Sequence, residues 1–212
     1  MKYGFFTDVH GDLEALHWVL ESLSDADQWY FLGDVCGGRE VGACLDLLRT
    51  HQVHCVPGNH DLWDFELTGL SLEQREYLAA LPLTRPVEDW LAVHSDFAQD
   101  QYGISFPYIY SQSDAQRAFG QFPQRFIFFG HTHASQLHQL QPDGQIHFYR
   151  PREPCMLQPD CRYLINVGAA PQVCLLYDSE LQCIEYRFRQ PVAPPPRPSE
   201  TKIGWWRKLL PW

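Results

Sequence analysis

The sequence lacks the features that mark secreted and membrane proteins. Its first residues, 1–6, contain no apolar run of the length that a signal peptide needs, and no stretch of eighteen apolar residues occurs anywhere in the 212 residues. The seven cysteines are odd in number and include no C-x-x-C pair, which argues against a disulfide framework and a zinc knuckle. We therefore expect a cytoplasmic protein without a transmembrane segment.

Positive charge is also scarce. Sixteen lysines and arginines stand against 26 aspartates and glutamates, so the formal net charge is −10. A surface of this sign repels a long polyanion, which excludes long nucleic acid as the expected partner and leaves a single nucleotide or a phosphodiester end open. The formal charge does not include bound divalent cations, which would offset part of the excess negative charge.

The composition predicts one folded domain followed by a different C-terminal segment. With 45% hydrophobic residues, the chain can bury a substantial core over residues 1–190. Residues 191–203 are rich in proline and read as an extended linker. Residues 204–212 combine three tryptophans with two basic residues and two leucines. We expect this Trp-rich segment to dock on its own chain or on a neighbouring subunit, with peripheral contact to a membrane surface as the alternative.

The first sixty residues alternate between short apolar runs and helical patterns. Strands are predicted at 3–7, 29–32 and 53–56, and helices from Asp12 onward and over 40–50. This alternation favours parallel β-α-β units. In such a sheet, the loops that follow the carboxyl ends of the strands gather at one edge, where binding sites are built.

The rest of the chain adds more strands than helices. The expected helices lie over 72–81 and near 113–120. A Pro-Asp-Gly turn signal at 142–144 predicts a hairpin. The architecture that results is an α/β fold, a sandwich of two facing sheets with helices outside. The expected strands cover 90–93, 126–129, 136–141, 145–150, 163–167, 173–178 and 182–189.

Histidine, carboxylate and amide side chains concentrate in the loops after the predicted strands. Imidazole together with carboxylate suits Mn, Fe, Zn, Co or Ni, whereas carboxylate alone would favour Mg or Ca. Seven nitrogen and oxygen ligands exceed one metal site once a place for water is reserved, and they suit two metals that share a carboxylate. The candidate ligands are Asp8, His10, Asp34, Asn59, His94, His131 and His133.

The order of these motifs resembles the signature of the calcineurin-like metallophosphoesterases. The resemblance spans residues 8 to 133, and the helix after Asp12 and the compact length are similar to the small bacterial and archaeal phosphodiesterase branch. It implies a metallophosphoesterase-type β-sandwich of two mixed sheets flanked by helices (α-β-β-α). The matching motifs are Asp8-x-His10, Gly33-Asp34, Gly58-Asn59-His60-Asp61, the lone His94 and Gly130-His131-x-His133.

The resemblance also implies how the ligands divide between two divalent transition-metal ions. Asp8, His10 and His133 would bind one ion, and Asn59, His94 and His131 the other. Asp34 would bridge the two. Manganese is the favoured metal, with iron, zinc, nickel or cobalt as alternatives.

The reaction implied by the resemblance is hydrolysis of a small phosphate ester, with a phosphodiester favoured. A hydroxide that bridges the two metals would attack phosphorus, while Asn59 and the cations neutralise charge on the phosphoryl oxygens. His60 would donate a proton to the leaving group, and Asp61 could orient His60. The alternatives are a non-catalytic protein-binding scaffold of the same fold, or a phosphomonoesterase or protein phosphatase. His60 beside a complete ligand set argues against the scaffold.

Three departures from the relatives bear on the substrate. Residues 35–38 (Val-Cys-Gly-Gly) lack the Asp-Arg of the Ser/Thr-phosphatase branch, which disfavours that branch. Ser95 replaces a usual glycine, and Asn166–Ala169 replaces an Asn-Pro-Gly-Ser stretch. We expect both altered loops to line the substrate pocket, so the substrate class stays open.

The loop after His94 is rich in aromatic residues, namely Phe106, Tyr108 and Tyr110. We expect these side chains to pack within the loop, and the alternative is that they stack on a nucleobase.

Overall fold

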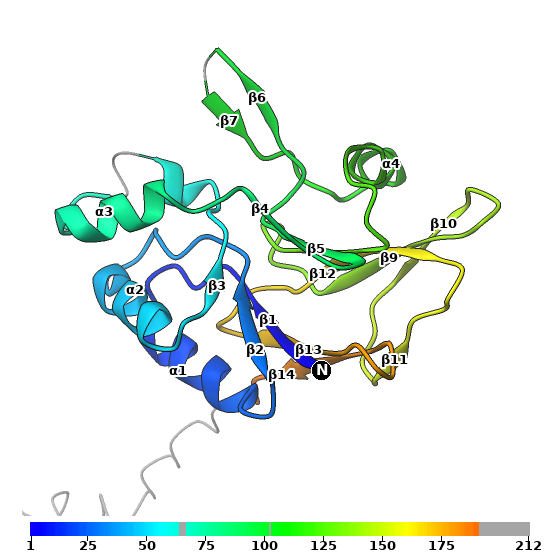
Figure 1. The fold of residues 1–212 in the computed structure, drawn as a ribbon, viewed down its shortest axis with the longest axis horizontal. Helices are drawn as coiled ribbons and strands as arrows, with labels where there is room; N and C mark the ends of the chain where they lie inside the picture. Colours follow the sequence, from blue (N-terminus) through cyan, green and yellow to red (C-terminus); the bar gives the residue numbers. More distant parts are fainter. Residues whose placement is uncertain (64–66, 102, 191–212) are drawn as a thin grey trace, which may run out of the picture.

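A computed structural model describes residues 1–63, 67–101 and 103–190 (Figure 1). The expected linker (191–203) and Trp-rich segment (204–212) lie outside these described residues. Two six-stranded sheets face each other, and helices cover their outer sides, which confirms the predicted α/β sandwich. Within the described ranges, no helix combines the length and the apolar character needed to cross a membrane.

The first sheet has the strand order β11-β14-β13-β1-β2-β3. Strands β1, β2 and β3 are parallel, as the β-α-β pattern predicts, and β13 joins β1 in the antiparallel sense, so the sheet is mixed. Its strands are β1 (Lys2–Phe6), β2 (Gln28–Phe31), β3 (His54–Cys55), β11 (Cys155–Met156), β13 (Val173–Asp178) and β14 (Cys183–Phe188).

The second sheet has the order β10-β9-β12-β8-β5-β4 and is also mixed. Strands β5, β8 and β12 are parallel, whereas β9 and β10 form the predicted antiparallel hairpin at one edge. A separate two-stranded sheet joins β6 to β7. The strands are β4 (Thr84–Val87), β5 (Trp90–Val93), β6 (Ala98–Asp100), β7 (Gly103–Ser105), β8 (Phe126–Phe129), β9 (Gln136–Leu140), β10 (Ile146–Tyr149) and β12 (Arg162–Asn166).

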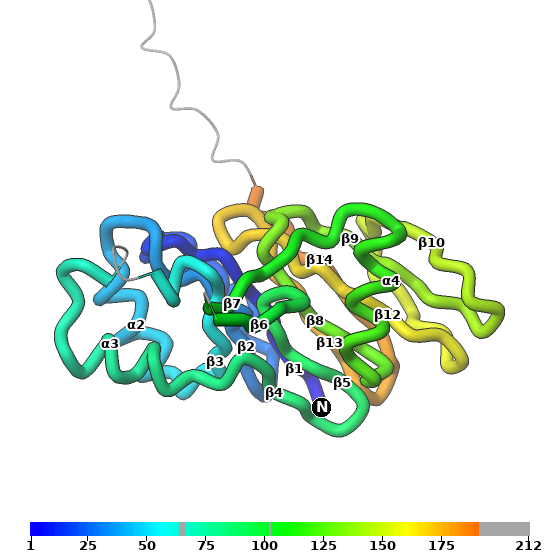
Figure 2. Tube along the Cα trace, turned by 90° about the horizontal axis from the view of Figure 1, so that it is seen from above, coloured from blue at the N-terminus to red at the C-terminus, as the bar shows by residue number. Residues whose placement is uncertain are grey.

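Four α-helices occur in the described residues, and they lie on opposite sides of the two sheets. Helices α1, α2 and α3 are on the side of the first sheet, and α4 is on the side of the second (Figures 1 and 2). Helix α1 begins where the sequence predicts, because the Asp12 carboxylate accepts a hydrogen bond from the backbone of Ala15. The helices are α1 (Leu13–Ser22), α2 (Val41–Thr50), α3 (Leu72–Ala79) and α4 (Gln112–Gln121), with a short 3-10 turn η1 at His60–Leu62.

Alternation along the strands separates three apolar layers. In β1, Phe5 points between the sheets, where its ring stacks on that of Phe128 at a centroid distance of 3.9 Å. The next residue, Phe6, packs with α1 residues such as Leu16 on the outer side. A third cluster, which includes Phe119, joins α4 to the second sheet. Burial of each such side chain contributes about 1.5–3 kcal/mol, so these layers fix the strands whose ends carry the site.

Candidate metal centre

The loops after five parallel strands bring all the predicted ligands to one edge of the sandwich. These loops follow β1, β2 and β3 of the first sheet and β5 and β8 of the second. Three groups of donor atoms form there, and within each group the atoms lie within 4.8 Å of one another. The groups are Asp8, His10 and His133; His10, Asp34 and His60; and Asp34, His94 and His131.

The first group converges on one carboxylate oxygen. Oδ1 of Asp8 lies 3.1 Å from Nε2 of His133 and 3.9 Å from Nε2 of His10, and the two imidazole nitrogens are 3.3 Å apart. Two imidazole nitrogens and one carboxylate oxygen that face a common point form the donor set of a transition-metal site.

Neighbouring groups orient the other atoms of these ligands. The hydroxyl of Thr7 donates to Oδ2 of Asp8 at 2.8 Å, and the backbone N–H of His131 donates to the same oxygen at 3.1 Å. Nδ1 of His10 lies 2.8 Å from the carbonyl oxygen of Cys36, which turns Nε2 toward the site. Oδ1 of Asp8 is buried and, among the described residues, accepts no hydrogen bond of good geometry, although Nε2 of His133 lies 3.1 Å away. A buried carboxylate oxygen left in this way fits a cation ligand.

The group of Asp34, His94 and His131, which we call the second donor group, is arranged around His94. Its Nε2 lies 3.4 Å from Oδ2 of Asp34, 3.2 Å from Oδ1 of Asn59 and 3.2 Å from Nδ1 of His131. Its other ring nitrogen, Nδ1, lies 2.7 Å from the carbonyl oxygen of Leu32, which fixes the orientation of the ring. The group therefore unites the three residues expected around the second metal with the expected bridging carboxylate.

Asp34 shares one donor cluster with His10 and His60 and another with His94 and His131, so His10 connects it to the first group. Burial acts to raise its pKa, but the neighbouring His94, together with the backbone N–H of His60, lowers the pKa to about 2. For His94, burial opposes the charged form, yet Asp34 raises its pKa to about 9. Each group thus stabilises the charged form of the other, and a metal that binds here would have to displace the proton of His94, because a ligand imidazole is neutral.

The backbone of the ligand residues is strained. Five of the seven candidate ligands have a positive φ, which is uncommon for residues other than glycine, although aspartate and histidine adopt it more often than most. Left-handed backbone costs about 1–2 kcal/mol per non-glycine residue, and such conformations concentrate at functional sites. The five are Asp8 (55°), His10 (47°), Asp34 (63°), His131 (68°) and His133 (56°).

Two motif glycines allow the loops to approach each other closely. A Cβ atom at Gly58 would lie 2.1 Å from Oδ1 of Asp34, and one at Gly130 would lie 2.3 Å from the hydroxyl oxygen of Thr7. Neither distance is compatible with a side chain. The glycines before Asn59 and His131 are therefore required by packing around the carboxylates.

Asp61 has a structural role that the sequence did not indicate. It is 2% exposed, and its two oxygens accept three backbone hydrogen bonds, from Asp34 (2.8 Å), Cys36 (2.9 Å) and Gly58 (2.9 Å). Burial and then the charge of Asp34 raise the pKa of Asp61. These bonds tie the loop after β2 to the loop after β3 and place Asp61 behind the ligands.

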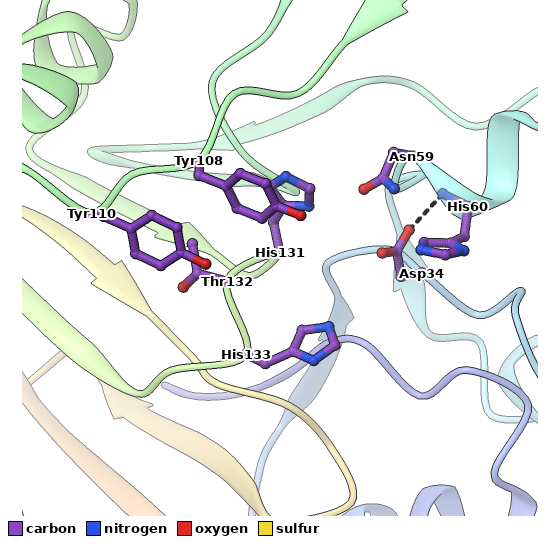
Figure 3. Close-up of a pocket in the computed structure, with 8 residues that line it drawn as sticks. All are labelled: Asp34, Asn59, His60, Tyr108, Tyr110, His131, Thr132 and His133. Carbon is purple, nitrogen blue, oxygen red and sulfur yellow. Dashed lines mark hydrogen bonds between the residues drawn. The ribbon is translucent and has the colours of Figure 1, made fainter.

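A pocket of about 230 Å³ opens over the centre (Figure 3). His60 faces this pocket, and its ring lies edge-on to His10 at 4.9 Å and near Trp63 at 4.5 Å. His60 therefore lies in the wall of the pocket, beside the donor groups. The pocket is lined by Asp34, Asn59, His60, Tyr108, Tyr110, His131, Thr132 and His133.

The aromatic loop divides into a buried and an exposed part. Phe106 is buried and meets His94 edge-on at 5.4 Å, as expected for loop packing. Tyr108 and Tyr110 also stack on each other within the loop, as expected, but they are 52% and 59% exposed and line the pocket.

The expectation that the two altered loops line the pocket is wrong. Ser95 and Asn166 are fully buried, and neither they nor residues 167–169 belong to the pocket wall. The Ser95 hydroxyl donates to the carbonyl oxygen of Pro107 at 2.8 Å. The Asn166 amide donates to the Thr132 hydroxyl at 2.6 Å. Both residues act from behind, by holding segments that do line the pocket.

Comparison with known proteins agrees with this geometry. The profile of the calcineurin-like phosphoesterase superfamily domain matches residues 1–172. The chain belongs to this superfamily. Members are metal-dependent phosphoesterases, and the donor clusters described above provide the residues for metal binding.

Solved structures share the fold of this superfamily member. A metallophosphoesterase from Sphaerobacter thermophilus is similar at 25% identity and a TM-score of 0.75, with 90% of this chain and 88% of that chain covered. A putative diadenosine tetraphosphatase has 14% identity and a TM-score of 0.57 over 90% of this chain and 95% of the other. An archaeal phosphodiesterase has 14% identity and a TM-score of 0.53, with 89% of this chain and 100% of the other covered. No curated protein matches the chain significantly.

Proposed function

We propose that this superfamily member is a phosphodiesterase that hydrolyses a small phosphate ester with two divalent transition-metal ions, manganese favoured. The observation that carries the proposal is the arrangement of two donor groups that His10 and Asp34 connect. A small-molecule substrate and a cytoplasmic location stay predictions from the sequence. The proposed ligands are Asp8, His10 and His133 for one ion and Asn59, His94 and His131 for the other, with Asp34 shared.

The donor chemistry fits two such ions. Imidazole, carboxylate and amide donors converge, and Oδ1 of Asp8 is buried and accepts no hydrogen bond of good geometry among the described residues. When bound, two cations supply a water of lowered pKa as nucleophile and neutralise negative charge on the phosphoryl oxygens.

The residues of the chain would orient the ester and handle its leaving group. Asn59 lines the pocket and can donate its amide N–H to a phosphoryl oxygen, because Oδ1 is the atom that faces His94. His60 lines the same pocket, and its backbone is fixed by the hydrogen bond from its N–H to Asp34 at 2.9 Å. Its imidazole would donate a proton to the leaving oxygen. Asp61 would act through the loop backbone that it holds, as a positioning residue.

The pocket favours a diester over a monoester. None of the residues in its described wall is lysine or arginine. A monoester dianion carries one more negative charge than a diester and would have to be balanced without those cations. The diester, with a single charge, requires less compensation from the wall.

A substrate panel with added manganese tests the proposal. We expect turnover of bis(p-nitrophenyl) phosphate to exceed that of p-nitrophenyl phosphate. Two metal ions should bind per chain, as measured by elemental analysis. Asp34→Asn should reduce turnover at least 100-fold, whereas Asp160→Asn, an exposed aspartate, serves as the control.

His60 separates an enzyme from a binding scaffold. His60→Ala should slow the release of a poor leaving group, such as an alkoxide, more than that of p-nitrophenolate, because only the poor leaving group needs a proton. Binding of fewer than two ions, or full turnover in Asp34→Asn, would count against the proposal.

A further inference from the structure

Two tyrosine rings, each more than half exposed, stack on each other beside the candidate metal centre. The rings of Tyr108 and Tyr110 are 5.3 Å apart and inclined by only 16°, and Tyr108 stacks on His131 at 4.3 Å and 11°. Figure 3 shows the two tyrosine rings side by side, with both hydroxyl groups on the side of the ligand residues. Tyr108 stacks between Tyr110 and His131, yet both tyrosines stay more than half exposed, so a planar ligand can reach the tyrosine pair from the pocket.

The segment that carries these rings is tied down at successive residues. The carbonyl oxygen of Pro107 accepts from Ser95 (2.8 Å), and that of Ile109 accepts from Gln136 (3.1 Å). Between them, the Ile109 side chain is buried in the cluster under α4. A loop that merely covers the protein surface does not need this many anchors.

Arg117 of α4 connects the tyrosine segment to a buried carboxylate. Its guanidinium donates to the carbonyl oxygen of Tyr108 (3.1 Å) and to Asp96 (2.5 Å), and also pairs with Asp114 (2.8 Å). The backbone N–H of Tyr110 donates to Asp114 at 3.2 Å. Because the rings are held in place before a ligand arrives, little conformational entropy is lost when one binds.

We propose that Tyr108 and Tyr110 are specificity-determining residues that stack on the nucleobase of a nucleotide ester while its phosphate lies at the metal centre. This inference rests on the proposed function, because it places the phosphate over Asp34 and His60. Nucleotides are a class of small phosphate ester that carries a planar ring at a distance from the phosphate, across the ribose, and aromatic side chains bind such rings through their faces.

The test compares two ligands that differ only in the base. Calorimetry on the full chain loaded with manganese gives dissociation constants for AMP and for ribose 5-phosphate. Stacking contributes about 1–3 kcal/mol per base, so AMP should bind roughly 5- to 100-fold more tightly. The preference should disappear in Tyr108→Leu combined with Tyr110→Leu, so that this variant binds AMP and ribose 5-phosphate equally.

Matched variants separate the ring from the hydroxyl and from general damage. Tyr108→Phe combined with Tyr110→Phe keeps the ring faces and should keep the preference for AMP. Tyr149→Leu removes an exposed tyrosine that does not line the pocket, and it should change neither constant. The single variants Tyr108→Leu and Tyr110→Leu provide the comparison if the double variant does not fold, as judged by its melting temperature and metal content.

Equal binding of AMP and ribose 5-phosphate by the wild type would overturn the inference, as would a preference that survives both leucine substitutions. These constants do not depend on turnover. A chain that prefers AMP but hydrolyses no diester would contradict the proposed function alone. A chain that hydrolyses diesters without the preference would contradict the role of the tyrosine pair alone.

Discussion

The backbone N–H of His60 donates a hydrogen bond of 2.9 Å to Oδ1 of Asp34, so the pocket histidine and the central carboxylate are held together by one contact. The reverse contact runs from the backbone N–H of Asp34 to Asp61, the next residue in the chain, at 2.8 Å. The loops after β2 and β3 are thereby joined in both directions. Any change that separates them displaces a ligand and the proposed proton donor at once.

Asp61→Asn should test this connection. The asparagine amide places a donor opposite a backbone N–H, so at least one of the three hydrogen bonds of Asp61 is lost. We expect the free energy of unfolding to fall by about 1–3 kcal/mol, with weaker manganese binding. Urea unfolding and manganese titration measure the two effects. Asp160→Asn is the control, and equal stability of both variants would contradict the structural role of Asp61.

Metal removal should lower the stability of the fold, because the metal binds the folded state. A ligand at 100 times its dissociation constant stabilises the folded state by about 2.7 kcal/mol, so addition of manganese to chelator-treated protein should raise the melting temperature by several degrees. Asp8→Asn removes a carboxylate oxygen from the first donor group and should abolish part of this increase. A melting temperature that does not respond to manganese would contradict metal binding at these residues.

Ser95→Ala should loosen the tyrosine segment without a change at the metal centre. The carbonyl oxygen of Pro107 loses a donor at 2.8 Å, which costs about 1 kcal/mol of stability. Because Ser95 does not line the pocket, kcat for a small diester should stay within about twofold, whereas KM for a nucleotide ester should rise. Steady-state kinetics with both esters measures the difference. An equal loss for both would show a more general disturbance.

The sequence predicted the strands that carry a clear apolar run or an alternating pattern and missed several that are short or exposed. Residues 90–93, 126–129 and 173–178 are strands with the predicted bounds, because the first two are apolar throughout and the third is apolar up to Asp178. The edge strand β4 contains Pro86, and β6 and β7 are short and largely exposed. Strands of this kind carry no hydrophobic periodicity, so only their pairing with neighbours defines them.

The meeting of the candidate ligands at one edge could be predicted, because chain order and sheet topology determine it. Each ligand follows a parallel strand, and parallel strands end at a common edge. The supporting contacts could not be predicted in this way. Asn166 reaches Thr132, and Arg117 reaches the carbonyl oxygen of Tyr108, through side chains whose direction depends on packing between distant segments. The sequence contains these residues but does not indicate which of them face each other in the fold.

The ion pair between Asp25 and Arg187 predicts an acid-dependent contribution to stability. Hydrogen bonds from Arg187, at 2.6 and 3.0 Å, lower the pKa of Asp25 to about 2. A carboxyl group with a lowered pKa stabilises the fold above its unfolded value near 3.9, and this contribution is lost as pH falls toward 2. Because the pair is partly exposed, about 1 kcal/mol is expected.

Arg187→Met should therefore be less stable than the wild type at pH 7, and the difference should shrink between pH 4 and pH 2. Arg187→Lys keeps the charge and should retain part of the effect. Urea unfolding at pH 7, 4 and 3 measures the differences. A gap between wild type and Arg187→Met that is constant over this range would contradict the assignment to Asp25.

Gln52 provides a measure of the backbone strain that the ligand residues carry. It has φ 53° at the end of α2, where its N–H donates to Arg49 and the N–H of Val53 donates to Leu48. This is the Schellman arrangement, in which glycine is favoured at the left-handed position. Gln52→Gly should raise the free energy of unfolding by about 0.5–1 kcal/mol, and Gln52→Ala should leave it nearly unchanged, because alanine keeps the Cβ atom.

Thermal and urea unfolding of these two variants give the energy of one left-handed residue outside the pocket. Neither substitution touches a donor group, so manganese binding should stay unchanged. Five candidate ligands adopt the same backbone region. Gln52 thus gives the approximate free-energy cost of a positive φ at each of these residues. If Gln52→Gly were no more stable than Gln52→Ala, a positive φ alone would carry no strain in this chain, and the strain argument for the ligand loops would fail with it.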